Sequence, residues 1–405
     1  MTTPSRPAIP SLADLPLHGA RVIDFSRLLP GPWCTQTLGD LGADVIKIEQ
    51  PEVGDYARYN PPTYKTVGAY FNGINRNKRS IALDLTDKKD RESAYKLIDG
   101  ADIVVESFRD GVPRKLAIDY ETLSKRSPSL IYCSITGFGN GSKLGRVPGH
   151  DLSIQGVAGT LLKTVEPGQK PSMPSYQGGD FTAAAFATMG VLSAYIRRMK
   201  TNAGCYLEIP MFQSLISVSN VGMSGALARV AGYTGTPEME PWGKNPRYNI
   251  YPTRDGKYVT ACLLEYRAWQ RFCEYIGRSE LAPAESWADR HTNHGARTGA
   301  IRQALADFCL SRDRDALLEE TRAAEIAICA VYTVDEAINS EHAREVGVVG
   351  FSEHPSEGRI PHFVDPLAAA GLSHPARLPS PALGQHTEEI LQELSTQTRK
   401  AATGG

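Results

Sequence analysis

The sequence predicts an α/β protein in which helices cover both faces of a parallel sheet. Short apolar runs recur through the first third of the chain, and helical patterns lie between several of them. Strands that are apolar along their whole length are typical of parallel sheets, because such sheets are buried on both faces. The chain also has 405 residues, more than one hydrophobic core usually supports, so we expect two domains.

Five apolar runs are the predicted strands of this sheet. In chain order they are RVIDFS (21–26), ADVIKIE (43–49), SIALDL (80–85), ADIVVESF (101–108) and LIYCSITGF (130–138). Helices are predicted between them over 35–42 and 87–100. The second helix has Asp87 near its start and Gly100 at its end, and both are residue types that cap helices.

Other elements are predicted in the rest of the chain. A strongly apolar helix is expected over 181–199, and a strand over 205–211 follows it. Residues 232–248 contain several Gly and Pro, which is typical of a linker or an exposed loop. Two β-rich runs around Asp255-Gly256 then predict a hairpin, which is followed by helices rich in Arg, Asp and Ala.

The composition argues against several classes of protein. The net charge is -1 without a basic block, so we expect neither a nucleic-acid partner nor a membrane surface. No apolar run approaches the roughly 18 residues that a membrane helix needs. The polar stretch MTTPSRPAIPSLADLP lacks an apolar signal core, so we expect a cytoplasmic protein. The seven cysteines form no CxxC pair, and neither a disulfide framework nor a metal site is predicted.

A carboxylate at the start of the long apolar helix is the first candidate for chemistry. Asp180 follows Gly178 and Gly179 in the stretch PSYQGGDFTAAAF. As a structural residue it would cap the helix, since Asp accepts hydrogen bonds from the free amides of a first turn. As a functional residue it would be a covalent nucleophile, with the glycines making room for a ligand. The helix-terminal amides would then stabilise an oxyanion.

Two more titratable residues stand at predicted turns. His150 lies in GRVPGHDLSIQG, where a lone histidine is more often structural, although His is readily poised near neutral pH. Glu265 lies in ACLLEYRAWQRF, between an apolar strand and a helix, where capping is the ordinary role of a carboxylate. The pattern alone leaves both a structural and a functional role open for each.

Two basic segments flank the predicted strands. The ordinary interpretation of NRNKRS (75–80) and of ESFRDGVPRKL (106–116) is a solvated charged surface. The second segment, however, leaves a strand of the parallel sheet, where sheets of this kind bind ligands. Its cations Arg109, Arg114 and Lys115 would be suited to hold phosphates. The usual phosphate-loop, nucleophile-elbow and HExxH metal patterns are absent from the sequence.

Taken together, these stretches resemble the class III CoA-transferase family, of the formyl-CoA and carnitine CoA-transferase type. The resemblance covers nearly the whole chain and rests on RVIDFSRLLPGPWCTQTLGDLGADVIKIEQPEVGD, NRNKRSIALDL, ADIVVESFRDGV, LIYCSITGFG and LGQHTEEIL, in this order. It implies a large Rossmann-like domain, a smaller α+β domain and a dimer of two interlocked rings. The implied domains are 1–225 for the first part of the large domain, 226–330 for the small domain and 331–405 for the return to the large one.

The resemblance also implies a reaction. In this family the nucleophile is the Asp of a GD turn before a long helix, and this motif falls on Asp180. The implied enzyme moves CoA from an acyl-CoA donor, such as succinyl-CoA, to a free carboxylic acid through an aspartyl-CoA thioester. CoA is then a substrate, and no permanently bound cofactor is expected. The segments that match the CoA contacts of relatives contain Leu83, Ser107, Phe108, Arg109 and Lys115.

The same resemblance leaves alternatives open, because the family also contains 2-methylacyl-CoA racemases. His150, Asp180 and Glu265 fall on the His, Asp and Glu that these racemases use, with the first two as an acid/base pair. The racemases' LDGGAP stretch is absent, and WGKNPRYNIYPT is closer to the carnitine CoA-transferase pattern. Besides the homodimer that we expect, the chain would also suit a hetero-oligomeric CoA-transferase with a paralogous subunit.

Overall fold

The computed structural model describes residues 10–162, 168–234, 244–283, 294–375 and 377–403. These residues form two compact units. The first unit consists of the described residues within Met1–Ala158, Pro174–Val218 and His342–Gly405. The second unit consists of those within Gly159–Met173 and Ser219–Glu341. The division into domains 1–225, 226–330 and 331–405 stays a prediction.

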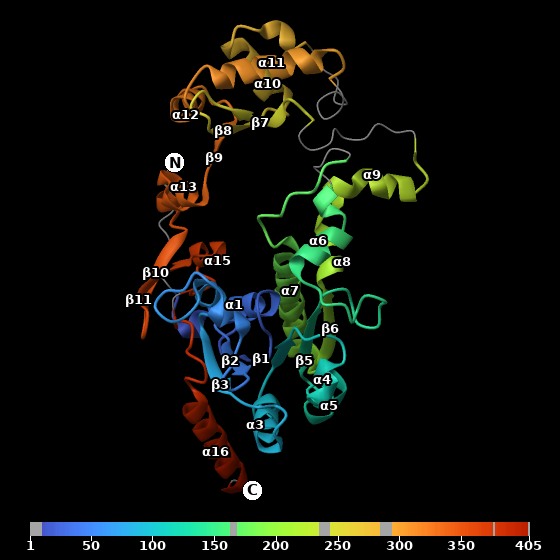
Figure 1. The fold of residues 1–405 in the computed structure, drawn as a ribbon. Helices are drawn as coiled ribbons and strands as arrows, with labels where there is room; N and C mark the ends of the chain where they lie inside the picture. Colours follow the sequence, from blue (N-terminus) through green and yellow to red (C-terminus); the bar gives the residue numbers. More distant parts are fainter. Residues whose placement is uncertain (1–9, 163–167, 235–243, 284–293, 376, 404–405) are drawn as a thin grey trace. The chain divides into compact units, whose positions relative to one another are not determined.

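A six-stranded parallel sheet forms the centre of the first unit (Figure 1). Its strands are β1 (Arg21–Asp24), β2 (Asp44–Glu49), β3 (Lys78–Ala82), β4 (Ile103–Glu106), β5 (Ile131–Thr136) and β6 (Cys205–Pro210). All neighbouring strands run parallel, in the order β3-β2-β1-β4-β5-β6. The predicted parallel sheet is therefore confirmed, with all five apolar runs in it.

The strand order reverses between β1 and β4. From β1 the chain builds the sheet outward to β3, and it then returns to the other side of β1 to add β4, β5 and β6. At such a point the loops after the two central strands diverge and leave a crevice at the carboxyl ends. The segments that follow β1 and β4 are thus the natural place for a ligand.

Helices cover both faces of this sheet. The helices of the first unit before residue 219 are α1 (Pro30–Asp40), α2 (Ala69–Ile74), α3 (Lys88–Asp99), α4 (Val112–Lys115), α5 (Tyr120–Arg126), α6 (Asp151–Val157), α7 (Gly178–Thr201) and α8 (Met211–Val218). In β1, Val22 belongs to the core with α1 and α7, and its neighbour Ile23 to the core with α3. This alternation follows from the two-residue period of a strand. The predicted caps of α3 are confirmed, since the carboxylate of Asp87 accepts two amide hydrogen bonds and Gly100 ends the helix.

The C-terminal part of the chain returns to the same unit. It contains the hairpin of β10 (Val349–His354) and β11 (Gly358–Phe363), and the helices α14 (Glu341–Val346), α15 (Pro366–Ala369) and α16 (Thr387–Thr403). The start of α16 docks on β3, where the amide of His386 donates to the carbonyl of Ser80 at 2.9 Å. The amide of Ala82 donates to the hydroxyl of Thr387 at 3.1 Å.

The second unit is built around a three-stranded antiparallel sheet. Its strands are β7 (Tyr248–Pro252), β8 (Tyr258–Cys262) and β9 (Ile328–Val331), and its helices are α9 (Asn220–Val230), α10 (Tyr266–Tyr275), α11 (Arg297–Leu310), α12 (Arg314–Ala323) and α13 (Val334–Asn339). Trp269 and Phe272 are fully buried in its core. The predicted hairpin is confirmed, because β7 and β8 meet at a turn in which Gly256 has φ +74°. Among all described residues, no helix is both long and apolar enough to cross a membrane.

Candidate active site

A cavity of about 660 Å³ opens at the reversal point of the large sheet, over the carboxyl ends of β1, β4 and β5. Five of the eight residues to which the family resemblance gives a catalytic or CoA-binding role line it, namely Ser107, Phe108, Arg109, His150 and Asp180. They come from three separate segments, which follow β4, precede α6 and begin α7. The fold therefore brings the proposed nucleophile together with three of the proposed CoA contacts.

Asp180 is the third residue of α7, and its side chain does not cap that helix. The cap comes from Asp151, the first residue of α6. Its Oδ1 accepts the amide of Gly179 at 2.7 Å and the amide of Asp180 at 3.3 Å. The amide group of Gln155 donates to its Oδ2 at 2.6 Å and so fixes the carboxylate. The capping hypothesis for Asp180 is therefore wrong, and its carboxylate is left to face the cavity.

The backbone amides at the start of α7 do not form the oxyanion site that we expect from the sequence. The four N-terminal amides of a helix have no partner within the helix itself. In α7 two of them bind Asp151, and those of Gly178 and Phe181 donate at 3.0 Å to backbone carbonyls that precede the helix. All four are thus engaged inside the protein. A donor to an oxyanion has to come from another group.

The glycine before Asp180 serves packing rather than ligand binding. A β-carbon placed on Gly179 would lie 3.0 Å from Cγ2 of Ile154 and 3.1 Å from Oδ1 of Asp151. Both distances are tighter than ordinary van der Waals contacts. The expectation that this glycine makes room for a ligand is therefore wrong, because the space beside it is filled by α6 and by the capping carboxylate.

The electrostatics of Asp180 suit a carboxylate that changes its charge near neutral pH. Burial raises the pKa of its carboxyl group to about 7, and the negative charge of Asp151 adds to this shift. Within the described part of the chain, its carboxylate accepts no hydrogen bond. The unprotonated form, which is the nucleophile or base, therefore becomes dominant only as the pH rises through this value.

Tyr70 also lines this cavity, and the sequence analysis missed it. Burial raises the pKa of its phenol, and the charges of Asp180 and Asp55 raise it further. The phenol therefore stays protonated and is able to donate a hydrogen bond. No motif marks this tyrosine in the sequence, because its role depends on how α2 lies beside the start of α7.

His150 precedes α6 directly and is exposed at the cavity. Its side chain makes no capping hydrogen bond, although it holds the N-cap position. Glu265 belongs to the second unit, where it precedes α10, and its side chain makes no capping hydrogen bond either. The proposed support of His150 and Asp180 by Glu265 stays a prediction.

Arg27, which follows β1, is a second residue that the sequence analysis missed. Its amide donates to the hydroxyl of Ser107 at 3.2 Å, which ties the loop after β1 to the loop after β4. Its guanidinium lies 5.1 Å from the ring centre of Phe108 and 5.4 Å from that of Tyr56. A cation–π arrangement of this kind holds the charge at the wall of the cavity.

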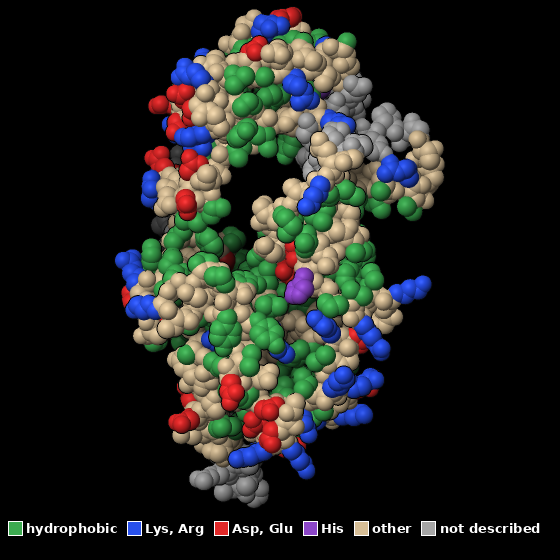
Figure 2. Space-filling view, viewed as in Figure 1, with side chains coloured by type: hydrophobic (Ala, Val, Ile, Leu, Met, Phe, Trp, Pro, Cys, Tyr) green, Lys and Arg blue, Asp and Glu red, His purple; other side chains and the backbone are tan. Residues whose placement is uncertain are grey.

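The other two proposed CoA contacts lie outside this cavity. Leu83 lines a smaller neighbouring cavity of about 130 Å³, which shares Arg27 and Phe108 with the first one. Lys115 is exposed on α4 and lines neither cavity. Figure 2 shows Lys and Arg side chains gathered over α4 and α5, so this side of the unit is basic. No group of three or more His, Cys, Asp or Glu that is suited to a metal ion occurs among the described residues.

A network of buried charges lies under the loop after β1. Nζ of Lys78 is 3.0 Å from the carboxylate of Asp24, and Nζ of Lys47 is 3.0 Å from that of Asp55. All four side chains are fully buried. Burial by itself would raise the pKa of Asp24, but the two lysines hold it well below its ordinary value. Burial lowers the pKa of Lys78 to about 8 despite its carboxylate partner.

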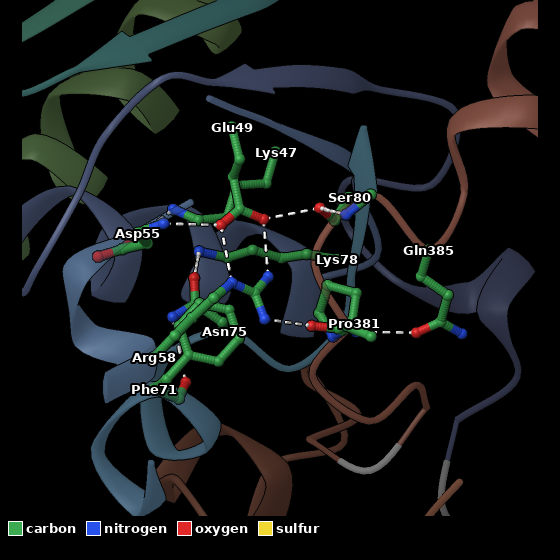
Figure 3. A network of polar contacts seen from close by, with 12 residues as sticks. Lys47, Glu49, Asp55, Arg58, Phe71, Asn75, Lys78, Ser80, Pro381 and Gln385 are labelled. Atoms are coloured by element: carbon green, nitrogen blue, oxygen red, sulfur yellow. Dashed lines mark hydrogen bonds and ion pairs between the residues drawn. The ribbon is translucent and has the colours of Figure 1, made fainter. Parts of the chain in front are cut away.

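This network extends to the segment that we had expected to be solvated. In NRNKRS, Lys78 is buried in the network, and the expectation of an exposed charged surface is wrong. Figure 3 shows the guanidinium of Arg58 facing both carboxylate oxygens of Glu49, at 2.7 and 2.9 Å. The same carboxylate accepts the hydroxyl of Ser80 at 2.6 Å and the amide of Asp55 at 3.0 Å.

With this geometry in view, comparison with known proteins identifies the family. The family model described as CoA-transferase family III matches residues 17–387. The chain belongs to this family. Its sequence is 30% identical to the succinate–glutarate CoA-transferase of Agrobacterium fabrum, over 95% of this chain and 97% of that protein. The predicted family, enzyme class and α/β fold are thereby confirmed.

Two further known proteins are similar to this chain over most of their length. The chain is 30% identical to the succinyl-CoA:mesaconate CoA-transferase of Haloarcula hispanica, over 94% of this chain and 97% of that protein. Among solved structures, a CAIB/BAIF family protein from Brucella suis has a TM-score of 0.78 and 31% sequence identity. That likeness covers 94% of this chain and 99% of the Brucella chain.

The contribution of Asp151 to the pKa of Asp180 is testable. Asp151→Asn removes the negative charge but keeps an oxygen that accepts the amide of Gly179. We expect the acid limb of the pH profile of kcat/KM to move to lower pH, by roughly one unit. The matched change Asp99→Asn alters an exposed carboxylate that pairs with Arg126, and it should leave the profile in place. An acid limb that stays fixed in Asp151→Asn contradicts this assignment.

Proposed function

We propose that this protein transfers CoA from an acyl-CoA donor to a free carboxylic acid, with Asp180 as the nucleophile. The observation that carries the proposal is the state of the Asp180 carboxylate. It lines the cavity at the reversal point of the sheet, it is relieved of capping by Asp151, and its pKa is about 7. Succinyl-CoA is the first donor to test, because two similar relatives carry succinate or succinyl-CoA in their names.

The proposed reaction proceeds through two enzyme-bound intermediates. A carboxylate oxygen of Asp180 attacks the thioester carbon of the donor, the C–S bond breaks, and the CoA thiolate leaves a mixed anhydride. The thiolate then attacks the aspartyl carbonyl, which releases the donor acid and forms an aspartyl-CoA thioester. The acceptor carboxylate reverses this sequence, so that CoA leaves on the acceptor and Asp180 is regenerated. A carboxylate suits this role because its anhydride is readily reversible.

Neighbouring side chains have distinct parts in this proposal. Because the amides of α7 are engaged, the protonated phenol of Tyr70 is our candidate donor to the developing oxyanion. His150 would orient the acceptor carboxylate. CoA would run along the segments after β3 and β4, with Leu83, Ser107, Phe108, Arg109 and Lys115 as contacts.

CoA is a substrate in this scheme, and the chemistry requires no permanently bound cofactor. The dimer of interlocked subunits, a hetero-oligomer with a paralogous subunit and the cytoplasmic location stay predictions.

A racemase or isomerase is the second candidate function. His150 and Asp180 line the same cavity, and a carboxyl pKa of about 7 is also suited to a general base. In that case the two side chains would exchange the α-proton of an acyl-CoA on opposite faces, through an enolate. Glu265 would support this pair.

Trapping the covalent intermediate tests the nucleophile. Incubation with a donor acyl-CoA, followed by hydroxylamine or borohydride, should modify the enzyme at Asp180 alone, as read by peptide mass mapping. Asp180→Asn and Asp180→Ala should fold and lose turnover by several orders of magnitude, because neither side chain forms an anhydride. Asp335→Asn, an exposed carboxylate of the second unit, should keep both labelling and turnover. A label on another residue would remove Asp180 from this role.

Solvent deuterium separates the transferase from the racemase. CoA transfer never breaks the α-C–H bond, so a chiral 2-substituted acyl group should keep its configuration and its hydrogen in D2O. A two-base mechanism requires exchange with solvent. His150→Ala would then cost about 10²–10⁴-fold, whereas a transferase keeps its nucleophile and loses less. Rapid deuterium incorporation from a single acyl-CoA without any acid present would favour the racemase.

The CoA contacts are tested by titration. Arg109→Ala should weaken CoA binding by roughly 1–3 kcal/mol, since a charged hydrogen bond to phosphate is lost at the cavity wall. Lys115→Ala should cost less, about 0.2–1 kcal/mol, because Lys115 lies outside the cavity and would make only a solvent-screened contact. Lys125→Ala, on the exposed end of α5, serves as the control. Unchanged CoA affinity in both Arg109→Ala and Lys115→Ala would remove these residues from the site.

A further inference from the structure

A second, larger cavity meets the first one at Asp180. Its volume is about 1010 Å³, and it lies among α1, α2, the start of α7 and the segment after β11. All of these elements belong to the first unit. Leu29, Asn60, Tyr70 and Asp180 line both cavities. The nucleophile therefore stands at the junction of two spaces within one compact body.

The two cavities have different walls. Ser107, Phe108 and Arg109, the proposed CoA contacts, line the first cavity and not the second. A CoA thioester that reaches Asp180 through the first cavity would thus direct its acyl group toward the second. The acceptor acid, which must attack the carbonyl carbon of the Asp180 thioester, has the same space open to it.

In the described part of the chain, four aromatic side chains line the second cavity. Trp33, Tyr70, Phe181 and Phe363 line it, together with aliphatic residues of α2 and α15. The rings of Trp33 and Phe181 pack edge to face with centres 5.9 Å apart. Such a wall takes up apolar surface and offers faces on which a planar group stacks.

The charges of this wall disfavour a second carboxylate. Arg76 is the one cation among the described residues that line the cavity. Both ends of its guanidinium bind Asp40, at 2.6 and 3.1 Å, and both side chains are buried. Asp365 adds another carboxylate to the wall. A distal carboxylate of a bound acid would lose its water there without gaining an unpaired cation.

We infer that this second cavity is the acid chamber of the enzyme and that it selects an acceptor with one carboxylate and a bulky apolar body, aromatic or branched. The inference rests on the proposed function, because it takes the carboxyl group of Asp180 as the group with which both acids must react. It differs from what the names of the relatives suggest, since succinate and glutarate are small dicarboxylates. It also predicts that succinyl-CoA, which would bring a distal carboxylate into the same space, is a slower donor than an acyl-CoA with an apolar acyl group.

A comparison of acceptors at a fixed donor tests the inference in the wild-type enzyme. Phenylacetate and 4-methylpentanoate are the bulky monocarboxylates, and succinate and glutarate are the dicarboxylates. The donor is the acyl-CoA that forms the aspartyl-CoA thioester fastest. With this donor we expect kcat/KM to be at least about tenfold higher for the bulky acids than for the dicarboxylates. A preference of similar size for the dicarboxylates would overturn the inference.

Filling the chamber gives the second test. Gly73 of α2 lines the cavity, and a β-carbon placed on it would meet no atom within 4 Å, so Gly73→Phe fits the backbone. We expect the KM of phenylacetate to rise at least about tenfold, while acetate as acceptor and the Kd of CoA change less than about threefold. Gly299→Phe is the matched control, since this exposed helical glycine of α11 is equally unobstructed.

The outcomes separate the inference from the proposed function. If no donor forms a CoA thioester on Asp180, the proposed function fails, and the acid chamber fails with it. If the thioester forms but Gly73→Phe leaves the KM of phenylacetate unchanged, only the assignment of the chamber is wrong. An equal loss of activity in Gly73→Phe and Gly299→Phe would also overturn it, because the effect would then not come from the cavity.

Discussion

The candidate site depends on a balanced set of buried charges beneath it. Asp24 and Asp55 supply two carboxylates, and Lys47 and Lys78 supply two ammonium groups, all without contact with solvent. Buried charges are costly, and only their mutual pairing offsets the lost hydration. The removal of one partner from such a set costs roughly 3–5 kcal/mol, because another charge is then left without a partner. This requirement holds the end of β1 against the middle of β2 and the start of β3.

This network reaches the site through the backbone. Oδ1 of Asp55 accepts the amide of Leu28 at 3.0 Å, and Leu28 has φ +65°, which is rare for a residue with a side chain. The carbonyl of Ser26 accepts a hydrogen bond from Lys47 at 2.7 Å. The buried side chains of Asp55 and Lys47 thus fix the backbone of the loop after β1. The side chains of Arg27 and Leu29 in this loop line the cavities.

Asp151 holds the start of α7 in place in a similar way. The carboxylate of Asp151, on α6, accepts the amides at the start of α7. The carboxylate of Asp180, on α7 itself, remains without a partner in the described part of the chain. The two carboxylates also interact through their charges, which helps to raise the pKa of Asp180 to about 7. Asp151 therefore both caps α7 and helps to raise the pKa of Asp180. Asp180 then stands between a space with basic and aromatic walls and a space with mainly apolar walls.

Much of the fold and the position of the candidate nucleophile followed from the sequence. Continuous apolar runs predicted the parallel strands, Asp87 and Gly100 predicted the ends of α3, and Asp255-Gly256 predicted the hairpin. These features are local, since a cap or a tight turn depends on a few neighbouring residues. The ordered series of stretches also indicated the family, and the GD turn indicated Asp180 as the residue to examine.

Only the tertiary structure decided which groups are free to act. Asp180 is not a cap because Asp151, 29 residues earlier, takes the amides of its helix. Lys78 is buried where β1 and β3, which lie on either side of β2, bring Asp24 beside it. Tyr70 and Arg27 join the site through contacts between distant segments. The charge, burial and bonding of a side chain depend on what folds against it. The sequence by itself therefore determined where the strands, caps and the candidate carboxylate lie, and the packing of α6, α2 and β1 decided their roles.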